Sequence, residues 1–208
     1  MRKDYQHGSL SKETVLENPF HQFESWLDES LNKGNHSANA MVLSTVDEKQ
    51  MPDSRIVLLR NISFGGFTFF TNYKSKKARD LEKNNKACLL FFWPELERQV
   101  RITGEIKFLP EHESDQYFDS RPFESQVGAW ISDQSRIVKG RAEIEKSYEA
   151  ALKKYEGKAV PRPAHWGGYV LVPTQFEFWQ GRANRLHDRI LYSLEATTGK
   201  WLISRLMP

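Results

Sequence analysis

Residues 98–108 read Arg98-Gln99-Val100-Arg101-Ile102-Thr103-Gly104-Glu105-Ile106-Lys107-Phe108, and this stretch decides the fold. Val100, Ile102, Ile106 and Phe108 share one parity, whereas polar side chains such as Arg101 take the other. Side chains alternate between the two faces of a β-strand, so the pattern predicts a long strand with one apolar face.

The segments on both sides of this stretch favour β-structure as well. Each is a short apolar or aromatic run, and several end at a turn-like sequence such as Asp47-Glu48-Lys49-Gln50. The expected strands are Ala40–Val46, Arg55–Arg60, Phe67–Thr71, Lys86–Trp93, Gly168–Val172, Gln175–Trp179, Arg189–Leu194 and Trp201–Leu206.

Helical patterns precede and interrupt these strands. Asn18-Pro19 is typical of a helix start, with Asn as N-cap and Pro in the first turn, and Gly34 ends that segment. Further helices are expected at Lys74–Asn84, Glu111–Ser120, Phe123–Ile131 and Arg141–Tyr155. Strands joined by short turns, without regular strand–helix alternation, favour a mainly β fold, an antiparallel barrel with peripheral helices. We expect residues 1–17 to form a mobile N-terminal segment and residues 18–208 a single domain.

Composition narrows the class of protein. The 30 Lys and Arg exceed the 27 Asp and Glu by only three, so the net charge gives no reason to expect a nucleic-acid partner. No apolar stretch approaches the ~20 residues that cross a bilayer, and the polar N-terminus carries no export signal. With one cysteine, Cys88, an internal disulfide framework is ruled out, and we expect a cytoplasmic protein without a membrane partner.

Aromatic residues are abundant, at 12% of the chain. They could line an interface or a planar ligand, and a Phe-rich core explains them equally well. The sequence has no Walker loop, GxGxxG turn, CxxC pair, HExxH or GxSxG, and its six histidines show no metal-ligand spacing. We therefore expect no metal site, and any phosphate would be bound by arginine, lysine and serine side chains on a β scaffold.

Two basic clusters are candidates for such a site. The first is the strand Arg55–Arg60, whose terminal arginines could simply reach solvent. In a regular strand these two side chains would face opposite sides, so a shared ligand would require a bulge or a strand end there. The second is the turn after Thr71, where Lys76 and Lys77 open a helix. Cations at a helix N-terminus are unfavourable unless an anion binds there. A phosphate site and a solvated or RNA-binding face fit this turn equally well.

Two further polar clusters could bind a ligand. If the end of Gln180–Arg189 is extended, Arg185, His187 and Arg189 share one face and suit an anionic or electron-rich ring. Like charges on one face repel, so a purely structural role is the poorer explanation. In Tyr117–Ser125, a tyrosine, an arginine and a serine could clamp a phosphate, although helix junctions commonly carry Ser and Pro without a ligand.

Together these segments make the chain similar to the pyridoxamine 5'-phosphate oxidase family over nearly its whole length, from Arg2 to Pro208. The segments that carry the resemblance are Arg2-Lys3-Asp4-Tyr5, Arg55-Ile56-Val57-Leu58-Leu59-Arg60, Phe70-Thr71-Asn72, Glu97-Arg98-Gln99-Val100, Tyr117-Phe118-Asp119-Ser120-Arg121-Pro122, Ser125-Gln126-Val127-Gly128-Ala129-Trp130, Trp166-Gly167-Gly168-Tyr169, Glu177-Phe178-Trp179-Gln180-Gly181 and Arg185-Leu186-His187-Asp188-Arg189. Each motif alone is weak, and their order along the chain makes the match specific.

The resemblance implies an FMN-binding split β-barrel and a homodimer that holds each FMN at the interface between its subunits. The implied FMN contacts are Arg55, Ile56, Val57, Leu58, Leu59, Arg60, Phe70, Thr71, Lys76, Lys77, Gln99, Gln134, Ser135, Trp179 and Arg189. The implied substrate contacts are Arg2, Tyr5, Arg60, Tyr117, Arg121, Ser125, Arg185, Leu186 and His187, and the resemblance makes Arg185 and His187 the catalytic pair.

The implied reaction is the FMN-dependent oxidation of pyridoxamine 5'-phosphate and pyridoxine 5'-phosphate to pyridoxal 5'-phosphate, with O2 as acceptor and hydrogen peroxide as product. Two alternatives are a flavin reductase on the same barrel and a non-catalytic flavin- or pyridoxal-phosphate-binding protein. The family usually has lysine at the position of Arg60, and often Ser-Arg-Lys at Ser75-Lys76-Lys77. Charge is kept in both places, but arginine and lysine place their donors differently.

Overall fold

The computed structural model describes residue 5 and residues 8–208 of the chain. Within this part, nine strands form one antiparallel sheet. The strands are β1 Ala40–Val46, β2 Pro52–Leu58, β3 Asn61–Ser63, β4 Gly66–Asn72, β5 Lys86–Trp93, β6 Arg98–Phe108, β7 Trp166–Gln180, β8 Asp188–Leu194 and β9 Trp201–Arg205. The helices are α1 Pro19–Asn32, α2 Lys76–Lys83, α3 Glu111–Asp119, α4 Phe123–Ile131 and α5 Arg141–Tyr155, with a short 3-10 turn η1 at Ala183–Arg185.

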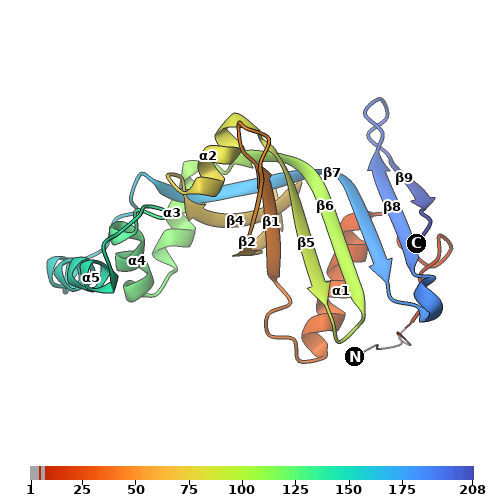
Figure 1. The fold of residues 1–208 in the computed structure, drawn as a ribbon, viewed down its shortest axis with the longest axis horizontal. Helices are drawn as coiled ribbons and strands as arrows, with labels where there is room; N and C mark the ends of the chain where they lie inside the picture. Colours follow the sequence, from red (N-terminus) through yellow and green to blue (C-terminus); the bar gives the residue numbers. More distant parts are fainter. Residues whose placement is uncertain (1–4, 6–7) are drawn as a thin grey trace.

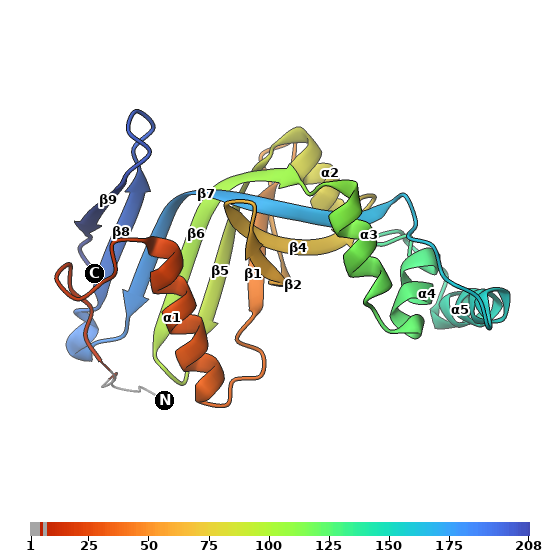
Figure 2. The same cartoon turned by 180° about the vertical axis from the view of Figure 1, so that it is seen from behind.

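The sheet is organised around β7, which has 15 residues. Its order is β2-β1-β5-β6-β7-β4-β3, and β8 also pairs with β7 and carries β9. The first part of β7 pairs with β4 on the side away from β6, and its last six residues pair with β8 on that same side. The sheet curls as a result, as Figures 1 and 2 show, and the predicted antiparallel barrel with outer helices is confirmed.

The apolar face of β6 and the helix α1 build the core. Val100 and Ile102 are fully buried, as their alternation predicts, whereas Phe108 at the strand end is exposed. From α1, Phe23 contacts the rings of Phe67 and Phe91 edge-on, with centroids 4.9 and 4.8 Å away. Figure 2 shows α1 lying across the sheet, so this helix closes the core, as the apolar spacing predicted.

Three details of the strand predictions were wrong. The segments 168–172 and 175–179 were expected as separate strands, but both belong to β7. Pro173 and Thr174 lie where the pairing with β6 shifts register between Thr103 and Gly104, so a bulge takes up the sequence that looked like a turn. In addition, β2 begins at Pro52, and the short strand β3 was not predicted.

Helices α3, α4 and α5 lie together at one end of the molecule, beside the start of β7 (Figure 1). They enclose a second apolar cluster that includes Phe118, Val127, Tyr155 and Trp166. None of the helices in the described residues is long and apolar enough to cross a membrane.

Candidate functional site

A cavity of about 640 Å³ lies where β2, β4 and the start of α2 meet the segment after α4. We call it the basic cavity. Its lining residues are Asp53, Arg55, Ile56, Val57, Leu58, Arg60, Phe70, Thr71, Lys76, Lys77, Arg79, Gln134 and Ser135. The structure therefore brings together most of the residues expected to contact FMN. Leu59 is buried instead of lining the cavity, and Gln99, Trp179 and Arg189 are elsewhere.

The strand end resolves the problem posed by Arg55 and Arg60. Within a regular strand these side chains would face opposite sides, but β2 ends at Leu58. The backbone of Arg60 instead donates a hydrogen bond to the carbonyl of Thr68 on β4. Both arginines can then line one cavity, because the strand ends between them, which was one of the two possibilities given by the sequence.

The start of α2 presents buried positive charge to this cavity. Ser75 is the N-cap, and its hydroxyl accepts from the backbone N–H of Ala78. The Lys77 side chain is 8% exposed, and its Nζ donates to Gln134 Oε1 at 2.7 Å and to Thr71 Oγ1 at 3.2 Å. Burial, reinforced by the nearby Arg55 charge, lowers the pKa of Lys77 to about 8. An ammonium held in this way gains from any anion that enters the cavity.

Two carboxylates accompany these cations. Asp53 lies 2.6 Å from Arg55 Nη2 and 3.4 Å from Lys76 Nζ, and Asp80 accepts from Lys76 Nζ at 3.0 Å. Burial raises the pKa of Asp53, but its bonds to Arg55 and Lys76 outweigh this and keep that pKa below its usual value. The hydrogen bond with Asp80 is the main cause that raises the pKa of Lys76. Sequence reasoning missed both acids, and the spacing of Asp80 four residues after Lys76 was the available signal.

An aromatic wall joins the basic cavity to the junction of α3 and α4. Phe70 stacks on Tyr117, with ring centroids 4.0 Å apart, and on Trp166 at 5.4 Å. Arg121 lies over Trp166 at 4.7 Å, and Arg60 lies over Tyr117 at 5.6 Å. This is the phosphate-clamp region predicted from the sequence.

Arg121 has an unused hydrogen-bond donor at this junction. Its Nη1 atom is buried and has no hydrogen-bond partner among the described residues. Burial is the main cause that lowers the pKa of Arg121. Ser125, in the first turn of α4, lies four residues further along the same junction. A buried donor without a partner is costly, and an anionic ligand would satisfy it.

A second group of predicted residues lies at the far end of β7, and we call Tyr5, Trp179 and His187 the ring cluster. The Tyr5 ring centroid is 5.7 Å from that of Trp179 and 5.6 Å from that of His187. The Nδ1 atom of His187 accepts from the backbone N–H of Arg182 at 3.1 Å. A neutral imidazole bonded in this way carries its proton on Nε2. Gln99 is the cross-strand partner of Trp179.

Two arginines beside the ring cluster differ from each other. Arg189 pairs with Trp179 across β7 and β8, and its guanidinium donates to Glu177 Oε1 at 2.8 Å and to the Met207 carbonyl at 2.8 Å. Arg185 was expected to share a strand face with His187 and Arg189, which is wrong. It lies in η1 with a positive φ of 62°, because the β7–β8 connection turns there and β8 begins only at Asp188.

The structure describes only part of the N-terminal segment for which predictions were made. Arg2 lies outside the described residues. Leu10, further along the predicted mobile segment 1–17, is buried, and its backbone N–H donates to Asp188 Oδ2 at 3.1 Å. The expected mobility of the segment stays a prediction.

The basic cavity and the ring cluster are well separated within one chain. Ile56 on β2 lies on one cross-strand row with Val42, Leu90, Arg101 and Glu177, the last on β7. Four strand spacings of about 4.8 Å make a path of about 19 Å along the curved sheet between the two ends of this row. The ring cluster lies at its β7 end, so the predicted site residues form two groups rather than one.

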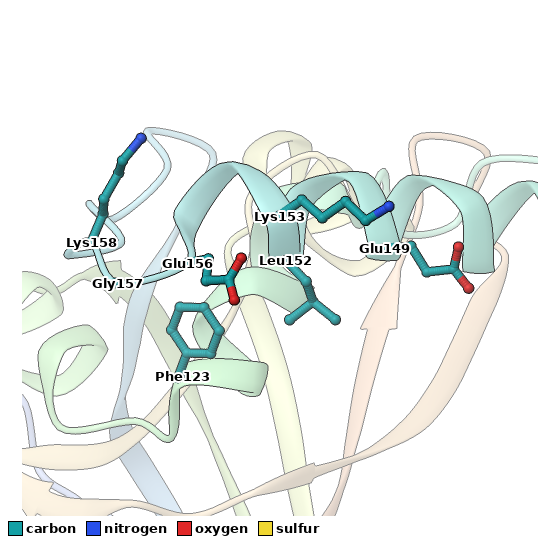
Figure 3. Close-up of a pocket in the computed structure, with 7 residues that line it drawn as sticks. All are labelled: Phe123, Glu149, Leu152, Lys153, Glu156, Gly157 and Lys158. Carbon is teal, nitrogen blue, oxygen red and sulfur yellow. The ribbon is translucent and has the colours of Figure 1, made fainter.

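A larger cavity of about 980 Å³ lies between the start of α4 and the end of α5 (Figure 3). Its lining residues are Phe123, Glu149, Leu152, Lys153, Glu156, Gly157 and Lys158. None of these was predicted to bind a ligand, and two acids oppose two lysines. The cavity therefore lacks the excess of cations over acids that marks the basic cavity.

Comparison with known proteins agrees with the geometry. Residues 27–155 match the family described as pyridoxamine 5'-phosphate oxidase, and residues 166–208 match the pyridoxine 5'-phosphate oxidase C-terminal dimerisation region. A protein from Cytophaga hutchinsonii named pyridoxine/pyridoxamine 5'-phosphate oxidase is 52% identical over 209 residues, which cover 100% of this chain and 97% of that protein.

Solved structures show the same architecture. PhzG from Burkholderia lata 383, in complex with tetrahydrophenazine-1-carboxylic acid, has a TM-score of 0.88 at 27% identity, over 96% of this chain and 98% of that chain. A pyridoxamine 5'-phosphate oxidase-related, FMN-binding protein from Nostoc punctiforme has a TM-score of 0.74 at 15% identity, over 93% of this chain and 100% of that chain. The sheet and its outer helices thus define a split barrel, the fold that these solved structures share. Within that class, the chain belongs to the pyridoxamine 5'-phosphate oxidase family.

The buried ammonium of Lys77 gives a test by pH. Its pKa is about 8 in the folded chain and 10.5 as the ordinary value, so between these limits the unfolded chain binds more protons. Burial of the charged Lys77 therefore lowers the free energy of unfolding below pH 8, and this free energy rises as the pH increases from about 8 to about 10.5. We expect urea unfolding to show wild type gaining stability relative to Lys77→Met across this window. The exposed Lys74→Met should show no such trend, and a flat difference for Lys77→Met would contradict the burial of its charge.

Proposed function

We propose that this protein binds FMN and oxidises pyridoxamine 5'-phosphate and pyridoxine 5'-phosphate to pyridoxal 5'-phosphate, with O2 as acceptor and hydrogen peroxide as product. The observation that carries the proposal is the presence of two anion-binding positions on either side of an aromatic wall. Lys77 and Arg55 form one position. The other is formed by Arg121, whose buried Nη1 has no hydrogen-bond partner among the described residues. A flavin phosphate and a substrate phosphate require such a pair. The relatives near 50% identity carry the matching name.

The basic cavity fits the phosphate and part of the ring system of FMN. Its volume of about 640 Å³ is in the range of cavities that bind small molecules. Arg55, Lys76 and Lys77 would hold the phosphate, together with hydroxyl and amide groups of Thr71, Gln134 and Ser135. The segment from Ile56 to Arg60, with Phe70, would lie along the rest of the molecule. FMN supplies the two-electron redox chemistry when bound.

We further propose that the second half of the FMN site comes from a partner subunit. Trp179 belongs to the ring cluster, and Gln99 and Arg189 pair with it on the neighbouring strands. They are separated from the basic cavity by four strand spacings, a path of about 19 Å along the curved sheet. The same outer face carries Ile56 and Phe92, which are 62% and 54% exposed. Apolar side chains exposed on a sheet face are typical of an interface. The match of residues 166–208 to a dimerisation region supports this homodimer.

The substrate would bind between the aromatic wall and the ring cluster of the partner subunit. Arg60, Tyr117, Arg121 and Ser125 would hold its phosphate. Arg185, Leu186 and His187 would orient its ring, and Tyr5, with Arg2, would cover it and exclude water. Charged groups at both ends would hold the substrate in one orientation. This lowers the entropic part of the reaction barrier.

His187 and Arg185 would have different tasks. The bond from Arg182 to Nδ1 fixes the ring of His187 and leaves Nε2–H as a donor toward the substrate. Arg185 is exposed and held at a turn with positive φ, so its guanidinium can extend over a ring that enters beside it. It would hold and orient that ring against the flavin.

PhzG supports a second candidate, an oxidase that acts on a tricyclic acid. Its structure has a TM-score of 0.88 to this chain and holds tetrahydrophenazine-1-carboxylic acid. Its identity of 27% is about half that of the protein from Cytophaga hutchinsonii, so we favour the pyridoxamine 5'-phosphate reaction. A flavin reductase and a flavin carrier remain outcomes that an assay can separate.

The proposed function is tested by anaerobic reduction of the bound flavin. Flavin released by acid from the protein should be FMN. Added pyridoxamine 5'-phosphate should bleach its absorbance without oxygen and yield pyridoxal 5'-phosphate and ammonia, and air should then restore the colour with formation of hydrogen peroxide. Release of FAD, bleaching only by the phenazine acid or by a reduced nicotinamide, or no bleaching at all would overturn the proposal.

Arg185→Leu tests the assignment of the turn after β7 to the substrate. Loss of one charge contact at the reacting centre should lower kcat/KM roughly a hundredfold. FMN should remain bound, because its phosphate is held in the basic cavity. Arg141→Leu, on the exposed α5, is the matched control and should keep the wild-type rate. If Arg185→Leu bleaches as fast as wild type at limiting substrate, the assignment is wrong.

A further inference from the structure

Asp80 is a buried carboxylate directly behind the basic cavity. It lies on α2 one turn after Lys76, is 5% exposed and is not among the cavity-lining residues. Its Oδ2 accepts from the hydroxyl of Thr45 at 2.9 Å and from Lys76 Nζ at 3.0 Å. The same oxygen lies 3.8 Å from Arg55 Nη2. One acid thus contacts two of the cations proposed to bind phosphate.

Thr45 extends this contact to Arg55. Its hydroxyl donates to Asp80 and accepts from Arg55 Nη1 at 2.8 Å. The same nitrogen also donates to the carbonyl of Leu43 at 3.1 Å. Arg55 is therefore held on one side by a chain of hydrogen bonds that ends on the buried carboxylate.

The negative charge of Asp80 lies behind cations that are proposed to bind an anion, and its presence there has a geometric explanation. By simple electrostatics Asp80 weakens phosphate binding, and a buried carboxylate is costly unless it is paired. Its compensation is geometric, because the long side chains of Arg55 and Lys76 would otherwise repel each other and lose their common direction. Fixing them before the ligand arrives lowers the ordering cost of binding.

Asp53 provides the internal contrast. It pairs with the same two cations, at 2.6 and 3.4 Å, but it is 36% exposed and lines the cavity. Its carboxylate lies on the side from which a ligand phosphate would approach. Removal of its charge therefore removes repulsion without removing the support behind the cations.

We propose that Asp80 is a positioning residue that, with Thr45, presents Arg55 and Lys76 to the phosphate of the bound flavin. This inference rests on the proposed FMN site. It adds a residue that touches neither the flavin nor the substrate, and it assigns opposite effects to two acids that share the same partners.

The test is a fluorescence titration of the flavin-free protein with FMN and with riboflavin, which lacks the phosphate. Asp80→Asn keeps the size of the side chain and should raise the dissociation constant of FMN about tenfold, as expected for a lost charged hydrogen-bond network. The weaker binding of riboflavin should not change. Asp53→Asn, the matched control, should bind FMN as tightly as wild type or more tightly.

Thr45→Val is a second variant, which breaks the chain of hydrogen bonds and leaves the Asp80 charge in place. It should also weaken the binding of FMN and leave the binding of riboflavin unchanged. If urea unfolding shows that Asp80→Asn is not folded, Thr45→Val replaces it in the test. The inference is overturned if both Asp variants tighten FMN binding, or if FMN and riboflavin weaken in parallel. If wild type does not prefer FMN to riboflavin, the proposed FMN site itself fails, and the inference fails with it.

Discussion

The continuous antiparallel pairing of β7 is the constraint on which the rest of the structure depends. Its 15 residues pair with β6 along nearly the whole length, and with β4 and then β8 on the other side. Trp166, at its first end, belongs to the aromatic wall, and Trp179, near its last, belongs to the ring cluster. Because one hydrogen-bonded strand links them, the two groups cannot come together within one chain without breaking the sheet.

The second organising feature is the balance of charge around the basic cavity. The buried Lys77 has a lowered pKa because its charge is poorly solvated, and Asp53 and Asp80 offset the charges of Arg55 and Lys76. The cavity thus keeps an excess of positive charge for an anion, while two of its cations are paired with acids. Outside this cavity, at the junction of α3 and α4, Arg121 has a buried donor with no hydrogen-bond partner among the described residues. Both features favour ligands that carry phosphate.

Much of the fold could be predicted from local patterns. The alternation in 98–108 identified the long strand, and the helix boundaries after it agree with the structure to within a residue or two. Local chemistry also singled out the start of α2, because Lys76 and Lys77 are adjacent in sequence and stand at a helix start, but a solvated or RNA-binding face fitted the sequence equally well. The roles of individual residues in binding stay predictions.

What could not be predicted depends on tertiary contacts. The bulge near Pro173 looked like a turn, because only pairing with β6 keeps that segment in a strand. The turn at Arg185 follows from how β7 and β8 must connect, which no alternation reveals. The spacing of Asp80 to Lys76 was a local signal, but its contact with Thr45, 35 residues away in the sequence, could not be predicted. The separation of the two residue groups likewise required the strand order.

The central claim is that each complete site joins the basic cavity of one subunit to the ring cluster of its partner. The most direct measurement mixes two inactive variants, Lys77→Met and Arg185→Leu, by co-refolding, and assays the oxidation of pyridoxamine 5'-phosphate. In a two-fold dimer, half of the mixed population is hybrid and each hybrid has one intact site, so about a quarter of the wild-type activity should return. If both halves of a site came from the same subunit, no hybrid would have an intact site. Activity in the mixture would then stay at the level of the parent variants.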